Sequence, residues 1–147
     1  MLMELKIKLL SPKAVLPKYA TAGSAAMDLT ACLDEPVVIE PGQRVLLPTG
    51  IAIALPSPDY VALVFVRSSM GAKHGIALSN GVGVIDSDYR GEIKVGLTNL
   101  SDVSYTIQPG DRVAQLAILP VTQPTVVQVA ELNETDRGTG GFGSTGK

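Results

Sequence analysis

The fold is most constrained by a series of short runs in which apolar and polar residues alternate. These runs occupy residues 5–9, 37–39, 51–55 and 93–97. Side chains of an extended strand point alternately to its two faces, so a period of two predicts strands with one buried face. The runs are separated by turn-forming pairs such as Pro41-Gly42 and Pro109-Gly110. Many short strands with turns between them predict an antiparallel β-sandwich or β-barrel.

Three further segments complete the predicted organisation. Residues 61–66, VALVFV, have no polar face, which predicts a strand covered on both sides. The one candidate helix is a turn or two at residues 68–73. Residues 137–147, RGTGGFGSTGK, have too little apolar material for a core element and are expected to form a flexible arm. We therefore predict a body at residues 1–136 and an arm at 137–147.

Composition excludes several classes of function. The formal net charge of -2 over 147 residues provides no electrostatic footprint for a polynucleotide, although one nucleotide could still bind. The single cysteine, Cys32, cannot form an intrachain disulfide and is expected to be a small buried residue. One histidine, His74, excludes a multi-histidine metal site, and its role stays open. The N-terminal ten residues lack the apolar core of a signal peptide, and the longest apolar run is too short to span a bilayer, so we expect a soluble, cytoplasmic protein.

Residues 81–92, GVGVIDSDYRGE, are the strongest candidate for catalytic chemistry. In an extended backbone Asp86 and Asp88 would share one face and Tyr89 would take the other. The preceding Val84 and Ile85 are expected to desolvate Asp86 in part, which suits a carboxylate that takes a proton from water. The alternative interpretation is a tight turn, since Asp- and Gly-rich runs commonly form turns.

Three other segments carry candidate polar groups. Arg67, Ser68 and Ser69 follow the apolar run, where they could hold an anion; alternatively, the serines cap the short helix. Asp28 lies between apolar residues and is expected to form a structural salt bridge. Gln115 interrupts an apolar strand, so its amide must be hydrogen-bonded.

The arm partly matches a phosphate-binding loop. Residues 141–147, GFGSTGK, contain the glycine, four residues, glycine and lysine of that pattern, but no Ser or Thr and no helix follow. This is not a Walker loop. The arm is either a disordered tail or a segment that closes over a ligand and offers glycine N–H groups to phosphate oxygens. In the second case Arg137 would contact phosphate and Phe142 would stack on a flat base.

Read in order, five segments resemble the five motifs of the trimeric dUTP diphosphatases, or dUTPases. They are AGSAAMDLTA, VRSSMG, GVGVIDSDYRGE, RVAQLAI and RGTGGFGSTG, and the resemblance runs from about residue 5 to residue 147. Val66 stands where the family usually has proline, and Met27 is not the commonest residue in its motif. The resemblance implies an all-β, jelly-roll-like antiparallel barrel with one short helix and a glycine-rich arm. It also implies a homotrimer whose active sites are shared between subunits.

The resemblance further implies a reaction and the residues that perform it. Asp86 would be the general base that deprotonates the water attacking the α-phosphorus of dUTP, which gives dUMP and pyrophosphate. Tyr89 would pack against the deoxyribose and exclude a 2'-hydroxyl, while Asp28 would support the site structurally. The hairpin at about residues 80–95 would bind uracil, and Phe142 would stack on it. The implied substrate-binding residues are Arg67, Ser68, Ser69, Asn80, Val84, Ile85, Tyr89, Lys94, Gln115, Arg137, Phe142, Gly143, Ser144 and Thr145.

The implied cofactor is Mg²⁺, held by the triphosphate and water with no direct protein ligand. The reaction would limit uracil in DNA and supply dUMP for dTMP synthesis. The competing interpretations are a dCTP deaminase with the same barrel, a bifunctional enzyme, and a non-catalytic trimeric β-module. Deaminases of this type are typically longer and usually lack the IDSDY sequence and the glycine-rich arm. No nucleic-acid polymer and no membrane is an expected partner.

Overall fold

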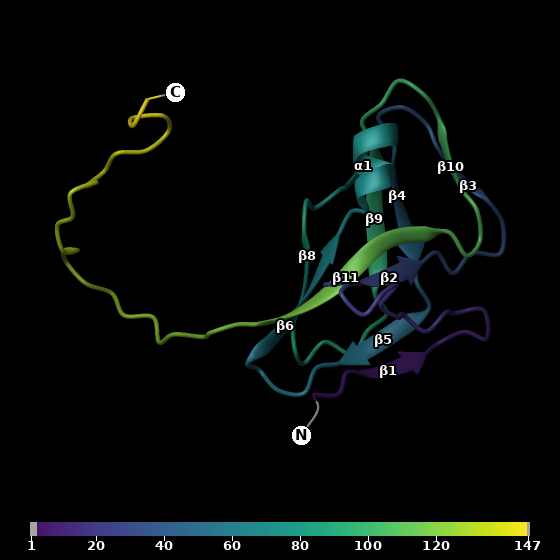
Figure 1. Ribbon diagram of the computed structural model, residues 1–147, viewed down its shortest axis with the longest axis horizontal. Helices are drawn as coiled ribbons and strands as arrows, with labels where there is room; N and C mark the ends of the chain where they lie inside the picture. Colours follow the sequence, from purple (N-terminus) through teal and green to yellow (C-terminus); the bar gives the residue numbers. More distant parts are fainter. Residues whose placement is uncertain (1–2, 147) are drawn as a thin grey trace.

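The computed structural model describes residues 3–146 and consists mainly of β-strands, with one short helix (Figure 1). The elements follow one another as β1 (Lys6–Leu9), β2 (Met27–Thr30), β3 (Val37–Ile39), β4 (Arg44–Pro48), β5 (Ile51–Ala54), β6 (Tyr60–Phe65), α1 (Ser68–His74), β7 (Ile76–Leu78), β8 (Gly83–Ile85), β9 (Lys94–Asn99), β10 (Tyr105–Ile107) and β11 (Arg112–Pro120). The predicted helix and the predicted alternating strands are therefore all present.

The strands pair in antiparallel fashion into small sheets. The largest has the order β2-β11-β6-β8, and a second has the order β4-β9-β7. Two-stranded ladders join β1 to β5 and β3 to β10. Within the described residues these sheets do not close into one continuous barrel. The predicted all-β, jelly-roll-like fold is confirmed, and the connections between distant strands bring residues far apart in sequence together.

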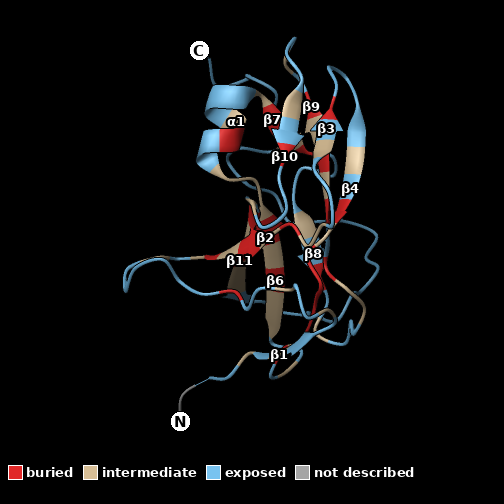
Figure 2. Cartoon of the chain, turned by 90° about the vertical axis from the view of Figure 1, so that its right-hand side faces the viewer, coloured by how far each residue is buried: buried red, intermediate tan, exposed pale blue. Residues whose placement is uncertain are grey.

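The core is formed by the inward face of the alternating runs (Figure 2). On β9, Val95 and Leu97 are fully buried and pair with β4 residues Leu47 and Val45. Burying each such side chain contributes about 1.5–3 kcal/mol. One polar residue, Asn99, is also fully buried, and its amide donates to the carbonyls of Ile39 and Val103. These bonds satisfy the amide inside the core.

Three burial predictions are wrong for the single chain. On β6, Ala62 and Val64 are buried, but the alternate residues of the strand are only half-buried, so its second face is not fully covered. On β1, Leu9 is exposed although it continues the alternation. The thiol-bearing Cys32 is half-buried rather than buried. The β6 difference arises because this chain covers only one side of that strand, whereas Leu9 lies at the end of β1, on the same face as the half-buried Ile7.

Helix α1 begins without a side-chain cap. Arg67 is its N-cap residue and makes no capping side-chain bond, so the predicted capping by Ser68 and Ser69 is wrong. Met70 is buried and anchors the helix on the body. The helix ends at Gly75, whose φ of 64° is left-handed and therefore favours glycine. Its N–H donates to the carbonyls of Gly71 and Met70. Within residues 3–146 there is no helix long and apolar enough to cross a membrane.

The C-terminal segment leaves the body as an extended arm (Figure 1). Secondary structure ends with β11 at Pro120, and Val121 donates the last backbone bond to the body, at the carbonyl of Asp59. Nearly all residues from 122 to 146 are exposed. Backbone bonds within the arm join residues three positions apart, such as Ser144 to Gly141. In the structure the arm thus comprises residues 121–146, and the boundary that we placed at residue 136 stays a prediction.

Candidate active site

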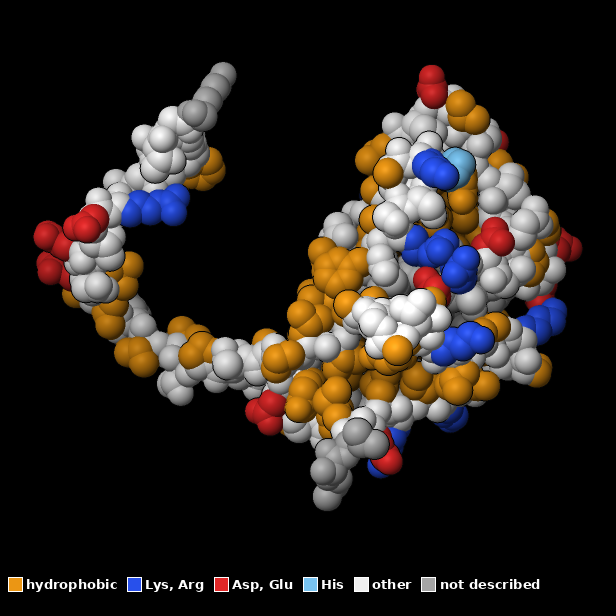
Figure 3. All heavy atoms as spheres, viewed as in Figure 1, with side chains coloured by type: hydrophobic (Ala, Val, Ile, Leu, Met, Phe, Trp, Pro, Cys, Tyr) orange, Lys and Arg blue, Asp and Glu red, His pale blue; other side chains and the backbone are white. Residues whose placement is uncertain are grey.

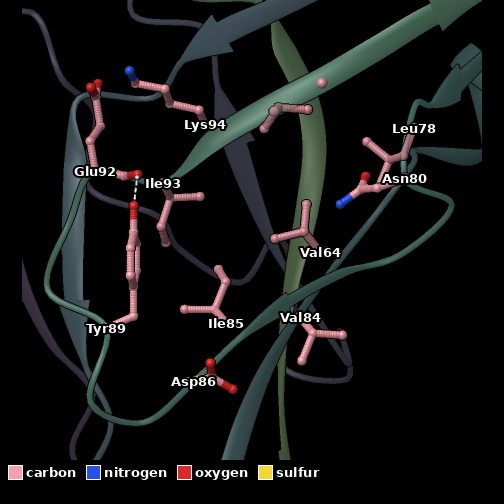
Figure 4. Close-up of a pocket in the computed structure, with 13 residues that line it drawn as sticks. Val64, Leu78, Asn80, Val84, Ile85, Asp86, Tyr89, Glu92, Ile93 and Lys94 are labelled. Atoms are coloured by element: carbon pink, nitrogen blue, oxygen red, sulfur yellow. Dashed lines mark hydrogen bonds between the residues drawn. The ribbon is translucent and has the colours of Figure 1, made fainter.

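A pocket lies between β8 with its flanking turns and the start of β9 (Figure 4). Its volume is about 420 Å³, a size suited to a small molecule. It collects six of the predicted site residues from three neighbouring stretches of chain. These are Asn80, Val84, Ile85, Asp86, Tyr89 and Lys94.

The apolar wall of the pocket follows from the register of β8. Val84 pairs with Leu63 of β6. Because successive side chains of a strand point to opposite faces, Val84 and Ile85 lie on opposite faces of β8. Ile85 is buried, whereas Val84 is exposed. Gly83 permits the close approach of β8 to β6, because a Cβ there would lie 3.0 Å from the Cβ of Val64. The result is an apolar surface with polar groups at its edges.

Asp86 lies in a turn at the edge of the pocket. Strand β8 ends at Ile85, and the N–H of Tyr89 donates to the carbonyl of Asp86 at 3.2 Å. The expectation of an extended backbone with Asp86 and Asp88 on one face is therefore wrong, and the alternative of a tight turn is confirmed. Asp86 is exposed, so Val84 and Ile85 do not desolvate it as expected. Asp88 does not line the pocket.

Tyr89 is fixed at the side of the pocket by its own loop (Figure 4). Its hydroxyl donates to the backbone carbonyl of Glu92 at 3.0 Å. The ring folds back over Gly91, where a Cβ would lie only 2.4 Å from the hydroxyl oxygen. Glycine at position 91 is thus required for this ring position. About half of the Tyr89 surface remains exposed and available to a ligand (46%).

A second polar cluster forms around Asp28 on β2. Its carboxylate accepts from Nε of Arg67 at 3.1 Å and from Nη1 of Arg112 at 3.3 Å. The Gln115 amide donates to the carbonyl of Val66 at 3.1 Å. The predicted salt bridge of Asp28 and the predicted hydrogen bond of Gln115 are both confirmed. Ser68 and Ser69 are exposed at the start of α1, beside this cluster in sequence.

The single chain does not join this cluster to the pocket. In the sheet order β2-β11-β6-β8, Asp28 lies on one edge strand and Asp86 follows the opposite edge strand. Hence Arg67, Ser68, Ser69 and Gln115 do not line the pocket.

The predicted ligands of the arm also lie apart from the pocket. Phe142 is fully exposed, with a positive φ of 51°, and Nε of Arg137 donates within the arm to the carbonyl of Gly140 at 2.8 Å. Gly143, Ser144 and Thr145 are exposed as well.

Seven residues that line the pocket are not among the predicted site residues: Val64, Leu78, Gly83, Glu92, Ile93, Val95 and Gly96. The Glu92 carboxylate accepts from the N–H of Gly50 at 3.0 Å. Glu92 closes the run GVGVIDSDYRGE, but a glutamate after glycine has no pattern that marks it as part of a site. Gly96 lies within the alternating pattern of β9. That pattern predicts which face of the strand a residue occupies, but it does not predict that the residue lines a pocket.

Comparison with known proteins identifies the group to which this arrangement belongs. The family model described as dUTPase matches residues 12–146. The chain belongs to the dUTPase family. Two curated relatives carry the name deoxyuridine 5'-triphosphate nucleotidohydrolase. The relative from Idiomarina loihiensis is 58% identical over 132 residues, covering 90% of this chain and 87% of the relative. The relative from Paraburkholderia phymatum is 54% identical over 147 residues and covers 99% of each chain.

Solved dUTPase structures have the same fold. The dUTPase of Staphylococcus bacteriophage 80alpha with dUPNHPP superposes with a TM-score of 0.88 at 30% identity, covering 98% of this chain and 99% of that one. A mutant dUTPase from phage phi11 of S. aureus, described as revealing the coordination of a structural Mg(II) ion, gives 0.80 at 26% identity and covers 89% and 99%. The resemblance drawn from the five motifs is confirmed, as is the fold expected from it.

Proposed function

We propose that this dUTPase hydrolyses dUTP to dUMP and pyrophosphate. The enzyme class predicted from the motifs, a dUTP diphosphatase, agrees with the family and with the names of relatives that are 50–58% identical. The observation that carries the proposal is the 420 Å³ pocket, which brings Asn80, Asp86 and Tyr89 together around an apolar wall. Limiting uracil in DNA and supplying dUMP for dTMP synthesis are the consequences of this reaction that we propose.

The pocket offers groups suited to a flat, polar base and a sugar. The Asn80 amide at the side of the pocket carries both donors and an acceptor. Uracil would enter between β8 and β9, where a cytosine amine would leave buried groups unpaired; such mismatches are strongly rejected. A thymine methyl would be excluded sterically. Tyr89 would face the deoxyribose, with no room for a 2'-hydroxyl.

Asp86 is positioned to activate water. Its carboxylate lies at the rim of the pocket, where solvent reaches it, next to the loop that carries Tyr89. We assign it as the general base that takes a proton from the water attacking the α-phosphorus, with pyrophosphate as the leaving group in an in-line displacement. Closure of the site around bound substrate would remove the exposure that Asp86 has in the single chain and strengthen its interaction with that water.

The remaining ligands would come from other copies of the chain in a homotrimer. Arg67 contacts Asp28 on the edge strand opposite the pocket, and Gln115 lies beside Asp28 on β11. This is expected if these two residues, together with Ser68 and Ser69, serve a neighbouring site. Figure 3 shows hydrophobic side chains gathered where the arm leaves the body, and Leu119 and Val121 at this point are exposed. Such an uncovered apolar surface supports burial against another subunit.

The arm would complete a site rather than stabilise its own body. Its exposed Phe142 would stack on uracil, while Arg137, Gly143, Ser144 and Thr145 would contact the phosphates. Positive φ values at Gly138, Gly143 and Gly146 mark tight turns in the arm. On binding, glycine N–H groups of these turns would be offered to phosphate oxygens.

Magnesium fits this site through the substrate. Among residues 3–146, acidic and histidine side chains nowhere gather in groups of three or more that could hold a metal. Mg²⁺ commonly binds through phosphate oxygens and water with few protein ligands, so the triphosphate would be its main ligand here. When bound, it would neutralise charge on the phosphates during the displacement.

The proposal is tested by pyrophosphate release from purified protein with magnesium and, in parallel, dUTP, dCTP, dTTP or UTP. We expect hydrolysis of dUTP alone. Ammonia release from dCTP would instead favour a deaminase with the same barrel. No pyrophosphate release with any of the four nucleotides, from a folded trimer that also fails to bind dUMP, would favour a non-catalytic module.

A further inference from the structure

Glu92 connects the tyrosine of the pocket to a turn on another part of the body. Its backbone carbonyl accepts from the Tyr89 hydroxyl at 3.0 Å, and its carboxylate accepts from the N–H of Gly50 at 3.0 Å. Gly50 lies between β4 and β5, 42 positions earlier in the sequence. The two bonds therefore place Glu92 between a ligand-facing ring and a distant backbone group. Figure 4 shows its carboxylate pointing away from Tyr89 while the carbonyl faces the ring.

The Gly50 end of this connection is rigid. The φ of Gly50 is 69°, which favours glycine, and its backbone is closely packed from behind. A Cβ at this position would lie 2.8 Å from the Cβ of Ala14 and 2.9 Å from Sγ of Cys32. The N–H of Gly50 is thus a fixed donor, and a carboxylate that accepts from it is held in one place. Hydrogen bonds to a charged acceptor are stronger than neutral ones.

The strand next to Glu92 is held by other bonds. The N–H of Ile93 donates to the carbonyl of Ile51 at 2.9 Å, and both the N–H and the hydroxyl of Thr49 donate to the carbonyl of Ile93. Ile93 itself is buried. Loss of the Glu92 carboxylate would leave these contacts intact. Its bond to Gly50 is therefore a restraint on residue 92 and on the loop before it, more than on the fold.

We propose that Glu92 is a positioning residue for Tyr89 and thereby a determinant of sugar specificity. This inference rests on the proposed dUTP hydrolysis and on Tyr89 as the group that faces the deoxyribose. A ring held from its hydroxyl end and folded over Gly91 has little freedom to yield to a 2'-hydroxyl. The Glu92 carbonyl shares its planar peptide group with the Ile93 N–H, which stays bonded to Ile51, so releasing Glu92 from Gly50 loosens this carbonyl from the Cα side only. The pocket then tolerates a ribose better and binds a deoxyribose less tightly.

The test compares Glu92→Ala, Glu92→Gln and Tyr89→Phe with the wild type, and uses Glu35→Ala as the control for loss of a glutamate outside the pocket. Glutamine keeps an oxygen that can accept from Gly50, whereas alanine keeps none. The measurements are kcat/KM for dUTP and for UTP, and amide hydrogen exchange of Gly50 and residues 86–92. A lost hydrogen bond to a charged group corresponds to roughly a 10- to 100-fold change, and the other bonds of this strand favour the lower end.

We expect Glu92→Ala to lower the preference for dUTP over UTP about tenfold and to speed exchange at Gly50 and in the loop. Glu92→Gln should stay within about twofold of wild type, since it retains a neutral acceptor. Equal loss with both nucleotides, or a glutamine variant as impaired as the alanine variant, would overturn the inference. So would unchanged selectivity in Glu92→Ala.

Two further outcomes are also decisive. If Glu92→Ala does not fold, Tyr89→Phe breaks the same connection at its other end, and unchanged selectivity there overturns the inference. If the wild type hydrolyses no dUTP, the proposed function fails separately. Hydrogen exchange then decides whether Glu92 restrains the tyrosine loop: faster loop exchange in Glu92→Ala supports the restraint, and unchanged exchange overturns it.

Discussion

Strand β6 and the Val126–Val129 stretch of the arm are both rich in β-branched residues, yet only β6 is buried by this chain. Val64 of β6 is 4% exposed, whereas Val126 of the arm is 96% exposed. Strand β6 lies between β11 and β8, which satisfy its backbone on both sides. The arm stretch has no strand partner among the described residues. A β-favouring composition alone therefore does not produce a paired, buried strand.

The difference identifies what each region contributes. The body, residues 6–120, contains the core and the pocket, and its contacts join residues far apart in sequence. The arm, residues 121–146, carries exposed apolar side chains and short-range turns. Ordering the arm costs conformational entropy that its own contacts do not offset. We therefore expect changes in the body to affect stability or chemistry, and changes in the arm to affect activity alone.

The largest expected effect is on the chemistry of the body. Asp86→Asn removes the proposed base, and loss of general-base catalysis should lower kcat roughly 10³-fold. Asp86 is exposed and its side chain makes no hydrogen bond among the described residues, so the melting temperature should stay unchanged. Pyrophosphate release and thermal melting measure the two quantities. Asp88→Asn, two residues away and outside the pocket, is the matched control; near-normal turnover by Asp86→Asn would remove Asp86 from this role.

The next largest effect is a difference in unfolding free energy between two leucine variants, one in the body and one in the arm, that differ in burial. Leu116 on β11 is fully buried and Leu132 in the arm is 85% exposed. Replacing Leu116 by alanine should cost about 3 kcal/mol of unfolding free energy through lost burial and a cavity, while Leu132→Ala should cost almost nothing. Denaturant titrations of the two variants measure this. Comparable losses would mean that Leu132 is buried against another subunit, and the comparison between the regions would then hold only for the isolated chain.

A feature of the fold could be predicted from the sequence where neighbouring residues determine it, and could not where residues far apart in sequence determine it. The alternation of β9 correctly predicts that Val95 and Leu97 are buried, because a period of two is a property of neighbouring residues. The apolar run of β6 predicts cover on both faces, and only one face receives it here. The burial of Asn99 was not predicted, because one of its partners, the carbonyl of Ile39, is 60 residues away.

The candidate site divides in the same way. Asn80, Asp86 and Tyr89 lie within one short stretch, so a hairpin brings them together and the motif predicts their proximity. Whether Arg67 and Phe142 reach the same ligand depends on how copies of the chain assemble, which no local pattern encodes. Glu92 was missed for a third reason: its partner Gly50 lies in a turn that the sequence does not connect to the tyrosine loop.

Removing the last part of the arm should lower activity by a smaller factor than replacing the proposed base, Asp86. Deleting residues 137–147 removes Arg137, Phe142 and the glycine turns, and loss of substrate positioning should reduce kcat/KM roughly 100-fold. The melting temperature should not fall, since this segment makes no long-range hydrogen bond among the described residues. Steady-state kinetics and melting of the truncated protein test this. Full activity would remove the arm from the site, and a large fall in stability would show that it packs on a body.

The smallest expected effect is that of a surface ion pair on stability. It tests whether polar contacts, rather than burial, distinguish the body from the arm. Lys13 and Asp34 form an ion pair on the surface of the body, with both side chains exposed. The hydrogen bond from the Lys13 ammonium, and its charge, lower the pKa of Asp34; the same contacts raise the pKa of Lys13. The Asp34 contribution to stability is thus present above its unfolded value of about 3.9 and is lost as the pH falls through the lowered folded pKa. The Lys13 contribution is present below about 10.4 and is lost as the pH rises through the raised folded pKa.

Exposed pairs are screened by water and salt and stabilise proteins little. We therefore expect Asp34→Asn to shift the melting temperature at pH 7 by no more than about 1 °C, and the shift to vanish in high salt or below the folded pKa of Asp34. Melting curves of both proteins at neutral and acidic pH, in low and high salt, measure it. The arm has exposed polar contacts of its own, such as Arg137 to the carbonyl of Gly140, and gains no core from them. A large, salt-resistant loss in Asp34→Asn would mean that surface pairing helps to hold the body together, and that burial alone does not explain its stability.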